Sequence, residues 1–285
     1  MESAIDAIFE VLSFGAIIVL VVLGLGVIAS MMGIFNFAHG EFVLLGAYTT
    51  YLVHGTGLPV WAGMLIAPFV VGACGFVLER LVIRRFYAAP IAAMLATYAL
   101  GLVIRESVRA LTGGLYFFVP EPIIGSLSVG GAQVSKWRLA IVIITASVVI
   151  GSYLLLTRTS FGLRVRAVLE NPSLARASGI STNAIYAVTF TFGAALAGLA
   201  GALVVPVFSL FADLGIRFLI QGFLAVMLGG VGTFEGPVAG GAAIGVMSAA
   251  LPWAVAPVLA DVLVFVIAIV FVKLRPAGLI SARRV

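Results

Sequence analysis

Charged residues are scarce in this sequence. Only 9% of its 285 residues are Asp, Glu, Lys or Arg, whereas 63% are hydrophobic and the mean hydropathy is +1.26. Soluble domains carry roughly half apolar and about a quarter charged residues, so a soluble globular protein is excluded. The pattern predicts a polytopic helical membrane protein. Its net charge of +5 then indicates basic cytoplasmic loops, and we predict no interaction with nucleic acid.

Cysteine, histidine and lysine are also rare. The single cysteine, Cys74, lies inside an apolar run, which excludes a disulfide framework and a cysteine-based metal site. The two histidines, His39 and His54, belong to no H-E-x-x-H motif, and no G-x-S-x-G motif is present. Neither Lys136 nor Lys273 completes a P-loop, so the chain cannot bind ATP through a P-loop of its own. We therefore predict a protein that is not an enzyme and has no catalytic, cofactor or metal site.

The apolar runs predict an all-α protein in which residues 1–285 form a single transmembrane domain. We expect about eight to nine transmembrane or half-membrane helices, because roughly 20 apolar residues cross about 30 Å of hydrocarbon. The spans are predicted at 11–35, 58–78, 90–104, 139–156, 184–210 and 257–272. The piece at 42–53 is short, which indicates a tilted or re-entrant half-helix. The N-terminus holds acidic residues and no early Lys or Arg, so we expect the first span to be retained and not cleaved as a signal peptide.

Two features within this layout are more specific. Gly193, Ala197 and Gly201 recur four residues apart in the span 184–210, a spacing that allows close packing of helices. Residues 105–138 form the longest polar excursion, and its pieces LYFFV and SLSV are separated by Pro and Gly. This excursion is predicted to form a small extracytoplasmic lobe with β-structure.

Residues 157–182, called the elbow below, concentrate charge between two long apolar runs. We predict two short helices, the first capped by Ser160 and the second beginning with Asn171 as N-cap and Pro172 at N1 and ending at Gly179. Such short helices are marginal in water, so this segment needs a partner. We interpret it as a cytoplasmic coupling loop; the alternative is an ordinary basic loop. Its charged residues are Arg158, Arg164, Arg166, Glu170 and Arg176.

The positive-inside rule tests the order of the spans. The loop at 79–89, the elbow and the C-terminal tail contain eleven of the sixteen Lys and Arg residues, so all three are expected in the cytoplasm. The elbow and the tail lie on the same side of the membrane only if residues 218–251 form a pair of short helices or a re-entrant hairpin and not one ordinary span. The side of the N-terminus stays open. Four basic residues fall on the outer side in this scheme, namely Arg105, Arg109, Lys136 and Arg138.

Two breaks interrupt apolar segments in comparable places of the two halves, NFAHGE at 36–41 and GGVGTFEGP at 229–237. Paired breaks of this kind often surround a transport pathway, and we expect these two to approach each other. The alternative is that Gly and Pro make tight turns at the membrane surface, with His39 a structural, hydrogen-bonded histidine. The candidate pathway residues are Asn36, His39, Glu41, Gly229, Gly230, Gly232, Thr233 and Glu235.

The apolar spans contain no evident pair of an acid and a base. A charge at membrane depth is costly, by roughly 2.5–3.5 kcal/mol on insertion scales, so a site for a charged side chain should show such a pair. We therefore predict a substrate that is apolar apart from its backbone charges. We also predict that the chain offers this substrate a passage without a tight site.

Four sequence blocks resemble the permeases of branched-chain amino-acid ABC transporters, of the type that pairs with a second permease. They cover nearly the full length in family order. The blocks are GIFNFAHGEFVLLGAY (33–48), ERLVIRR (79–85), SFGLRVRAVLENPSLARASGIS (160–181) followed by TFTFGAALAGLAG (189–201), and FLAVMLGGVGTFEGPVAGGAAIG (223–245). The acidic Glu235 departs from the uncharged residue expected there.

The resemblance implies a heteromeric importer in a bacterial-type inner membrane. This importer would contain two permease subunits as a heterodimer, two cytoplasmic ATPase subunits and an extracytoplasmic substrate-binding protein. The elbow would dock on the ATPase through Gly162, Arg164, Arg166, Asn171, Pro172, Ala175, Arg176 and Gly179. The implied substrate is a branched-chain or other apolar amino acid, and relatives with the same blocks carry urea or short-chain amides.

The sequence favours a permease subunit over two other classes of protein. A stand-alone channel or ion-coupled carrier would favour acidic groups embedded in the membrane as coupling sites, and the apolar centres contain almost none. An intramembrane enzyme would need a nucleophile with its base, or a metal set, and the sequence has neither.

Overall fold

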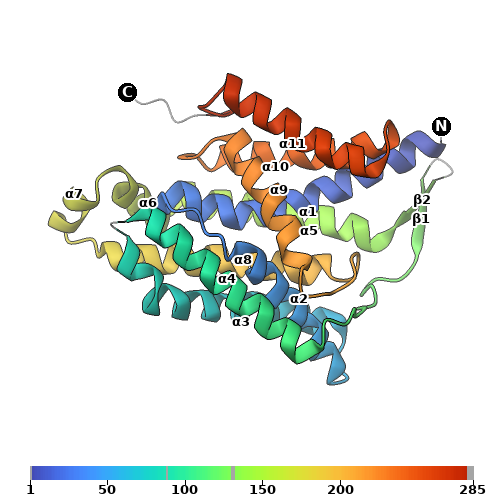
Figure 1. Ribbon diagram of the computed structural model, residues 1–285, viewed down its shortest axis with the longest axis horizontal. Helices are drawn as coiled ribbons and strands as arrows, with labels where there is room; N and C mark the ends of the chain where they lie inside the picture. The colour runs from blue at the N-terminus through green and yellow to red at the C-terminus, as the bar shows by residue number, and fades with distance from the viewer. Residues whose placement is uncertain (1, 88, 130–131, 281–285) are drawn as a thin grey trace.

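The computed structural model describes residues 2–87, 89–129 and 132–280, and helices dominate it (Figure 1). The helices of 16 or more residues are α1 (Glu2–Met32), α2 (His39–Gly55), α3 (Val60–Leu81), α4 (Pro90–Thr112), α5 (Lys136–Arg158), α8 (Thr182–Val204), α9 (Leu214–Gly229), α10 (Glu235–Ala250) and α11 (Pro257–Leu274). The short elements are η1 (Ile83–Phe86), β1 (Ser126–Val129), β2 (Ala132–Ser135), α6 (Ser160–Glu170), α7 (Pro172–Ala177) and η2 (Leu251–Trp253).

Six of the described helices, α1, α3, α4, α5, α8 and α11, are long and apolar enough to cross a membrane. The other three long helices, α2, α9 and α10, have 17, 16 and 16 residues. At ~1.5 Å per residue these three extend only about 24–26 Å, less than the hydrocarbon thickness. The prediction of an all-α polytopic membrane protein with several half-membrane helices is confirmed.

The helices run between two ends of the molecule, which are called the elbow end and the lobe end below. Figure 1 shows α6 and α7 at the left, and β1 and β2 at the right. The loop after α3 reaches the elbow end, because the Tyr87 ring lies 4.8 Å from the Tyr186 ring in the second turn of α8. The tail joins it there, since Ile280 donates to the carbonyl of Gly229. The three basic segments therefore lie at one end, although Arg283 and Arg284 fall outside the described residues.

The chain folds back after α1 without forming a helix. The first residue of α2, His39, places its Nε2 atom 3.0 Å from the carbonyl oxygen of Val21. The eleven helical steps from Val21 to Met32 extend about 16 Å towards the elbow end, so residues 33–38 return over that distance. Six extended residues span up to about 20 Å, which is sufficient. The ambiguous piece at 42–53 thus belongs to a helix that begins inside the bundle and runs to the lobe end.

Residues 214–250 form two short antiparallel helices. This agrees with the prediction from the positive-inside rule, which needed such a pair to place the basic elbow and the basic tail on the same side. The turn between α9 and α10 contains Gly230 and Gly232, both with φ above +90°, a region that favours glycine. The helices approach so closely that a methyl group at Gly240 would overlap the carbonyl oxygen of Ala225. The predicted pair of short helices is confirmed.

The two halves of the chain pack in corresponding ways. Helix α3 packs on α8 as α10 packs on α1, and the hairpin of α2 and α3 corresponds to that of α9 and α10. The halves meet where Gly24 of α1 faces Gly193 of α8, and where Gly40 of α2 faces Gly215 of α9. Because α1 and α8 run in opposite directions, this is the pattern of an inverted repeat.

This correspondence changes which breaks are equivalent. The partner of the break at residues 33–38 is the segment 205–213 between α8 and α9, and each contains a Phe-Ala pair near its end, directly before α2 in the first segment and one residue before α9 in the second. The Gly-rich turn at 230–234, which the sequence paired with NFAHGE, instead closes a helical hairpin. The glycines are evident in the sequence, but the equivalence of the helices depends on how they pack.

Three predicted boundaries are wrong. Helix α4 continues to Thr112 and Lys136 begins α5, so the lobe covers 113–135 and not 105–138. Helix α8 ends at Val204 and not at residue 210, because Pro206 has no backbone N–H with which to continue the hydrogen bonds of the helix. In the lobe SLSV pairs as β1 with β2 in antiparallel register, whereas LYFFV contributes only an isolated bridge between Phe117 and Leu210.

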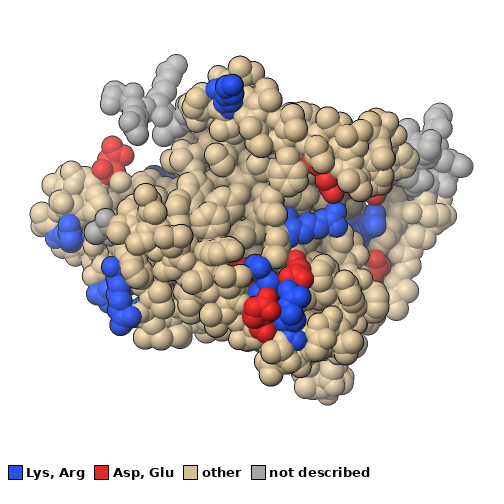
Figure 2. Space-filling model, viewed as in Figure 1, with Lys and Arg blue, Asp and Glu red and all other residues tan. Residues whose placement is uncertain are grey.

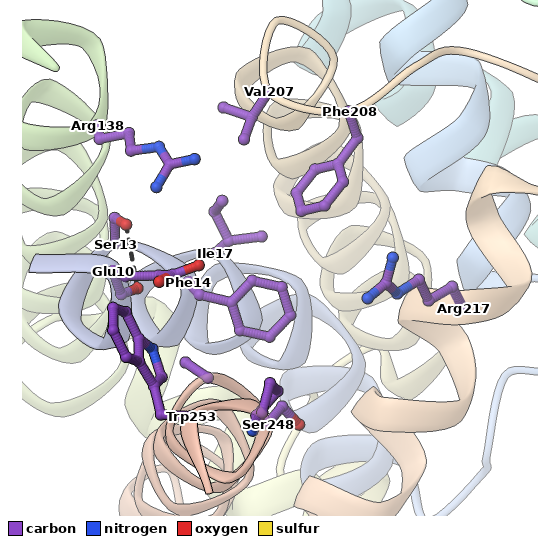
Figure 3. Close-up of a pocket in the computed structure, with 12 residues that line it drawn as sticks. Glu10, Ser13, Phe14, Ile17, Arg138, Val207, Phe208, Arg217, Ser248 and Trp253 are labelled. Carbon is purple, nitrogen blue, oxygen red and sulfur yellow. Dashed lines mark hydrogen bonds between the residues drawn. The ribbon is translucent and has the colours of Figure 1, made fainter. Parts of the chain in front are cut away.

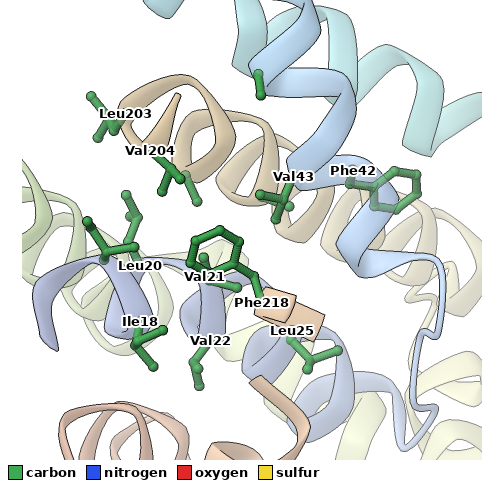
Figure 4. Packing of buried hydrophobic residues seen from close by; sticks show 14 of the residues in the cluster. Ile18, Leu20, Val21, Val22, Leu25, Phe42, Val43, Leu203, Val204 and Phe218 are labelled. Atoms are coloured by element: carbon green, nitrogen blue, oxygen red, sulfur yellow. The ribbon is translucent and has the colours of Figure 1, made fainter. Parts of the chain in front are cut away.

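The core lies between α1, α2, α8 and α9. Figure 4 shows Leu20 and Val21 of α1, Val43 of α2, Val204 of α8 and the ring of Phe218 of α9 meeting in this cluster. The small residues predicted to allow close packing are used in this way, since a methyl group at Gly201 would overlap the carbonyl of Val43. This tight core fixes the starts of α2 and α9 against each other.

Candidate functional site

The elbow is a capped pair of helices that leaves the bundle at its basic end. Thr159 has extended backbone, with φ −110° and ψ 161°, and its hydroxyl accepts a hydrogen bond from the Gly162 amide at 3.3 Å. Thr159 is therefore the N-cap of α6, and the predicted cap Ser160 is the first helical residue.

Two contacts fix α6 against the end of α5. The guanidinium of Arg166 donates to the carbonyl oxygen of Leu156 at 2.8 Å. Gly162 packs on the same residue so tightly that a methyl group there would overlap that carbonyl. Arg166 and Gly162 thus hold the elbow in place from within, whereas the predicted role was contact with an ATPase.

Helix α7 follows the sequence prediction closely. The Asn171 side chain accepts from the amides of Ser173 at 3.1 Å and Leu174 at 2.9 Å, with Pro172 at N1. Gly179 follows the helix with φ +82° and reverses the chain. These caps satisfy the ends of a helix that is too short to be stable on its own.

The surface of the elbow differs from the prediction at one position. Ala175 is only 4% exposed and faces the protein, whereas Leu174 is 62% exposed. Arg164 and Arg176 are also exposed, and no described carboxylate forms an ion pair with either. The elbow therefore exposes one large apolar side chain of α7 and two arginines, one on each of its helices.

We expect Gly162→Ala to detach the elbow while leaving the transmembrane helices folded. The added methyl group overlaps the backbone of Leu156, so α6 must move away and the Arg166 hydrogen bond is lost. Limited proteolysis of the purified protein should then cut between residues 157 and 182 at least several times faster than in the wild type. Gly151→Ala in α5 is the matched control, because nothing lies within 4 Å of the added methyl group. Equal cleavage rates in the two variants would contradict this role of Gly162.

A buried acid supports the elbow end and was missed by the sequence reading. Glu79 of α3 is fully buried and accepts a hydrogen bond from the Tyr87 hydroxyl, whose ring packs edge-on against Tyr186. Burial and the neighbouring Glu79 raise the pKa of the Tyr87 hydroxyl, so it remains a donor at neutral pH. The α3–α4 connection is thereby tied to the start of α8, directly after the elbow.

The second candidate site lies where α2 begins inside the bundle. Asn36, His39 and Glu41 are all at most 1% exposed. The Asn36 side chain accepts from the Ala38 amide at 3.0 Å, and His39 Nε2 makes its contact with the carbonyl of Val21. The interpretation of His39 as a structural, hydrogen-bonded histidine agrees with this geometry.

Glu41 forms a buried ion pair with Arg105. Its Oε1 atom accepts from both Nε, at 3.0 Å, and Nη2 of the Arg105 guanidinium, and the Arg105 side chain is only 13% exposed. The expectation that the spans contain no paired acid and base is therefore wrong. The sequence places Arg105 in the polar excursion after a span, whereas α4 includes Arg105 and carries it to the start of α2.

Arg105 lines a cavity of ≈ 490 Å³ with a mostly apolar wall. The wall is formed by Phe37, Tyr98, Ile216, Leu219, Ile220, Phe223 and Leu224. Phe37 and Phe223 stack with ring centroids 4.6 Å apart. This volume falls in the range of about 300–1,000 Å³ that is typical of small-molecule pockets.

A further charged residue lies beside Arg105 on the same face of α4. Arg109 lies one helical turn beyond Arg105 and contacts Asp213 at 2.7 Å and Glu106 at 3.1 Å, with all three side chains partly exposed. On the face drawn in Figure 2, the few charged residues lie at the elbow end, in a mixed cluster near the middle and in a further group to the right of it, and most of the remaining surface is uncharged. This face of the bundle is therefore unlike a surface that contacts only lipid.

The second predicted break lies elsewhere. Gly229 and Gly230 contact the tail, Thr233 Oγ1 accepts from the Gly236 amide at 3.1 Å, and Glu235 begins α10. The turn borders the elbow across a cavity of ≈ 230 Å³, which Gly232, Thr233 and Glu235 line together with Gly162 and Arg166. Because Gly40 contacts Gly215, the length of α9, about 21 Å, separates Gly40 from Gly229. The structure does not bring the polar residues of the two breaks together.

A third cavity, of ≈ 570 Å³, opens at the lobe end. Figure 3 shows Arg138 and Arg217 pointing towards it from opposite sides, with Glu10 and the aromatic Phe14 and Trp253 between them. No residue of this cavity was singled out from the sequence as a site residue.

Comparison with known proteins agrees with the blocks of sequence described above. A family model described as "Branched-chain amino acid transport system / permease component" matches residues 7–272. The chain is 28% identical to the permease protein BraD of a high-affinity branched-chain amino acid transport system of Pseudomonas aeruginosa, over 95% of this chain and 93% of that protein.

Two relatives come from Escherichia coli K12. The permease protein LivH of a high-affinity branched-chain amino acid transport system is 25% identical over 97% of this chain and 95% of its own length. The permease protein LivM is 26% identical over 79% of this chain and 59% of its own length. Since the family model covers nearly the whole membrane-embedded chain, this protein belongs to the family of permease components of branched-chain amino acid transport systems.

Proposed function

We propose that this chain is the permease subunit of an ATP-binding-cassette importer and forms the translocation pathway for branched-chain or other apolar amino acids. The observation that carries the proposal is the elbow, a capped helix pair that presents Leu174, Arg164 and Arg176 to a partner. The chain has no P-loop of its own, so ATP must be supplied by another subunit that meets this surface.

The elbow end faces the cytoplasm of a bacterial-type inner membrane in this proposal. Arg80, Arg84, Arg158 and Lys273 all lie at that end, and the positive-inside rule then places the lobe end outside. The N-terminus lies at the lobe end, since α1 runs from there to the elbow end. An extracytoplasmic binding protein would dock on the lobe, and two ATPase subunits on the elbow side of the complex.

A second permease is the proposed neighbour of the charged face. The Glu41–Arg105 pair lies inside the bundle, and Arg109 with Asp213 lies one helical turn closer to the lobe end, and contact of such charges with hydrocarbon would be costly. A related chain, together with a water-filled pathway between the two, would avoid that cost. The two relatives from one organism, LivH and LivM, support such a pair of unlike permeases.

The substrate class rests on the relatives and on the cavity. All relatives reported above are named for branched-chain amino acids, which favours these over urea or short amides. The apolar wall of the ≈ 490 Å³ cavity suits an aliphatic side chain. A stand-alone carrier would need no exposed apolar anchor at the elbow, so association with an ATPase discriminates between the two classes.

The test is co-purification from the native membrane. An affinity-tagged copy of this chain should retain an ATPase subunit and a second permease after mild detergent extraction, in about equal molar amounts. The extract of a strain that lacks the tag serves as the control. Recovery of the tagged chain alone, in a form that still transports leucine, would support a carrier and contradict the proposal.

A further inference from the structure

We propose that the cavity beside Arg105 is a binding site for an apolar α-amino acid, whose carboxylate binds the Arg105 guanidinium. This inference deepens the proposed function and rests on it, because it names where the permease holds its substrate during passage. It departs from the expectation of a passage without a tight site.

The first argument is the state of Arg105. Glu41 Oε1 accepts from two of the five guanidinium N–H groups, and the described residues give the remaining three no acceptor. The side chain nevertheless lines the cavity while being almost nine-tenths buried. A guanidinium with free donors in a site of low dielectric binds a carboxylate strongly and with defined geometry.

The second argument is the place of Glu41. This carboxylate does not line the cavity, and it lies behind Arg105 against Gly101, where an added methyl group would lie 3.1 Å from Oε2. Within the described residues its Oε2 atom has no hydrogen-bond partner. Glu41 is thus a positioning residue that orients Arg105 and compensates its charge, and it does not itself meet the substrate.

The third argument is the rest of the wall. Ile216, Leu219 and Ile220 form an aliphatic surface on α9, suited to the side chain of leucine, isoleucine or valine. The aromatic side chains of Phe37, Tyr98 and Phe223 also line the cavity, and an aromatic face attracts an ammonium group through cation–π interaction. One cationic group, aromatic faces and an aliphatic wall match the three parts of an apolar amino acid.

The position of the cavity between the two repeats is consistent with a role in transport. The cavity lies where the starts of α2 and α9 meet through Gly40 and Gly215, at the contact between the two repeats. Binding sites at the junction of inverted repeats are a recurring arrangement in transporters.

The main experiment measures uptake by the reconstituted complex with its ATPase and binding protein. Arg105→Gln should reduce leucine uptake at least about tenfold, the loss expected when a charge-assisted hydrogen-bonded pair is removed. ATPase activity stimulated by the loaded binding protein should stay within about twofold, and Arg105→Lys should keep part of the uptake. Arg138→Gln, an arginine of a different cavity, is the matched control and should transport like the wild type.

A double variant separates a binding role from a purely structural ion pair. In Glu41→Gln with Arg105→Gln both charges are removed together, so no buried charge is left without a partner. If the pair only stabilises the fold, this variant should regain uptake, and that result would overturn the proposal. If Arg105 binds the carboxylate, the double variant should fold normally and remain at least about tenfold impaired.

A labelling experiment tests the site independently of transport. Ile220→Cys, in a background with Cys74→Ser, places a thiol in the cavity wall. An anionic methanethiosulfonate should modify it faster than a cationic one, by about tenfold, because the guanidinium concentrates anions. Adding Arg105→Gln should abolish the difference, and an unchanged ratio would contradict the site even if the wild-type complex transports leucine. A wild-type complex that shows this ratio but no ATP-driven uptake would instead contradict only the proposed function.

Discussion

Replacing Leu174 by glutamate should abolish ATP-driven uptake without affecting the transmembrane bundle. Leu174 is the large apolar residue exposed on α7, and a helix of six residues presents few other groups to a partner. Truncating a central interface residue typically costs 2 kcal/mol or more, about 30-fold in affinity, and a buried carboxylate adds its own desolvation cost. The ATPase should therefore no longer co-purify with the variant.

The control for this experiment is Leu111→Glu. Leu111 is 87% exposed and lies at the opposite end of the molecule, in the last turn of α4. It tests whether a new carboxylate on any exposed leucine disturbs the protein, and it should keep the ATPase bound. Wild-type uptake by the Leu174 variant would contradict the role of the elbow as the ATPase contact. Ala175, chosen from the sequence as the position to enlarge, is unsuitable because its burial would couple docking to the folding of the elbow itself.

The second large effect is expected at the contact between the two repeats. Gly215→Ala adds a methyl group that overlaps the backbone carbonyl of Gly40, and neither backbone can yield without moving α2 against α9. Overpacking of this kind costs about 1–3 kcal/mol, which for a protein of this size lowers the midpoint of thermal unfolding by roughly 3–10 °C. Uptake per folded protein should also fall, because the Glu41–Arg105 pair and its cavity lie beside this contact.

Gly222→Ala on the same helix is the matched control. Its added methyl group would lie 3.4 Å from the Leu25 side chain, which is an ordinary van der Waals contact. Its unfolding midpoint should stay within about 2 °C of the wild type, as expected for a change of half a kcal/mol or less. Equal midpoints for the two variants, measured in the same detergent, would show that the repeats do not meet as described.

Local signals in the sequence predicted much of the architecture. Asn171, Pro172 and Gly179 define α7 because a cap, a first helical proline and a glycine with positive φ act within a few residues. The paired short helices at 214–250 followed from counting basic loops. The close helix contacts at Gly193 and Gly201 followed from their spacing.

The pieces that were missed depend on contacts between distant residues. Glu41 and Arg105 are 64 positions apart, and their pairing depends on α4 continuing through a stretch whose charges read as a loop. The equivalence of segments 33–38 and 205–213 likewise depends on how the helices pack. Tyr87 and Glu79 are close in sequence, but only the fold buries the carboxylate and supplies the hydroxyl as its partner.

One measurement tests the central claim most directly. The chain is reconstituted in liposomes with its second permease and two ATPase subunits, with leucine-loaded binding protein outside and ATP inside. The account predicts leucine uptake that stops when ATP is omitted, when the ATPase subunits are left out, or when Leu174→Glu replaces the wild type. Leucine uptake at an unchanged rate by the chain without ATPase subunits would contradict the claim that it is the permease of an ATP-driven importer.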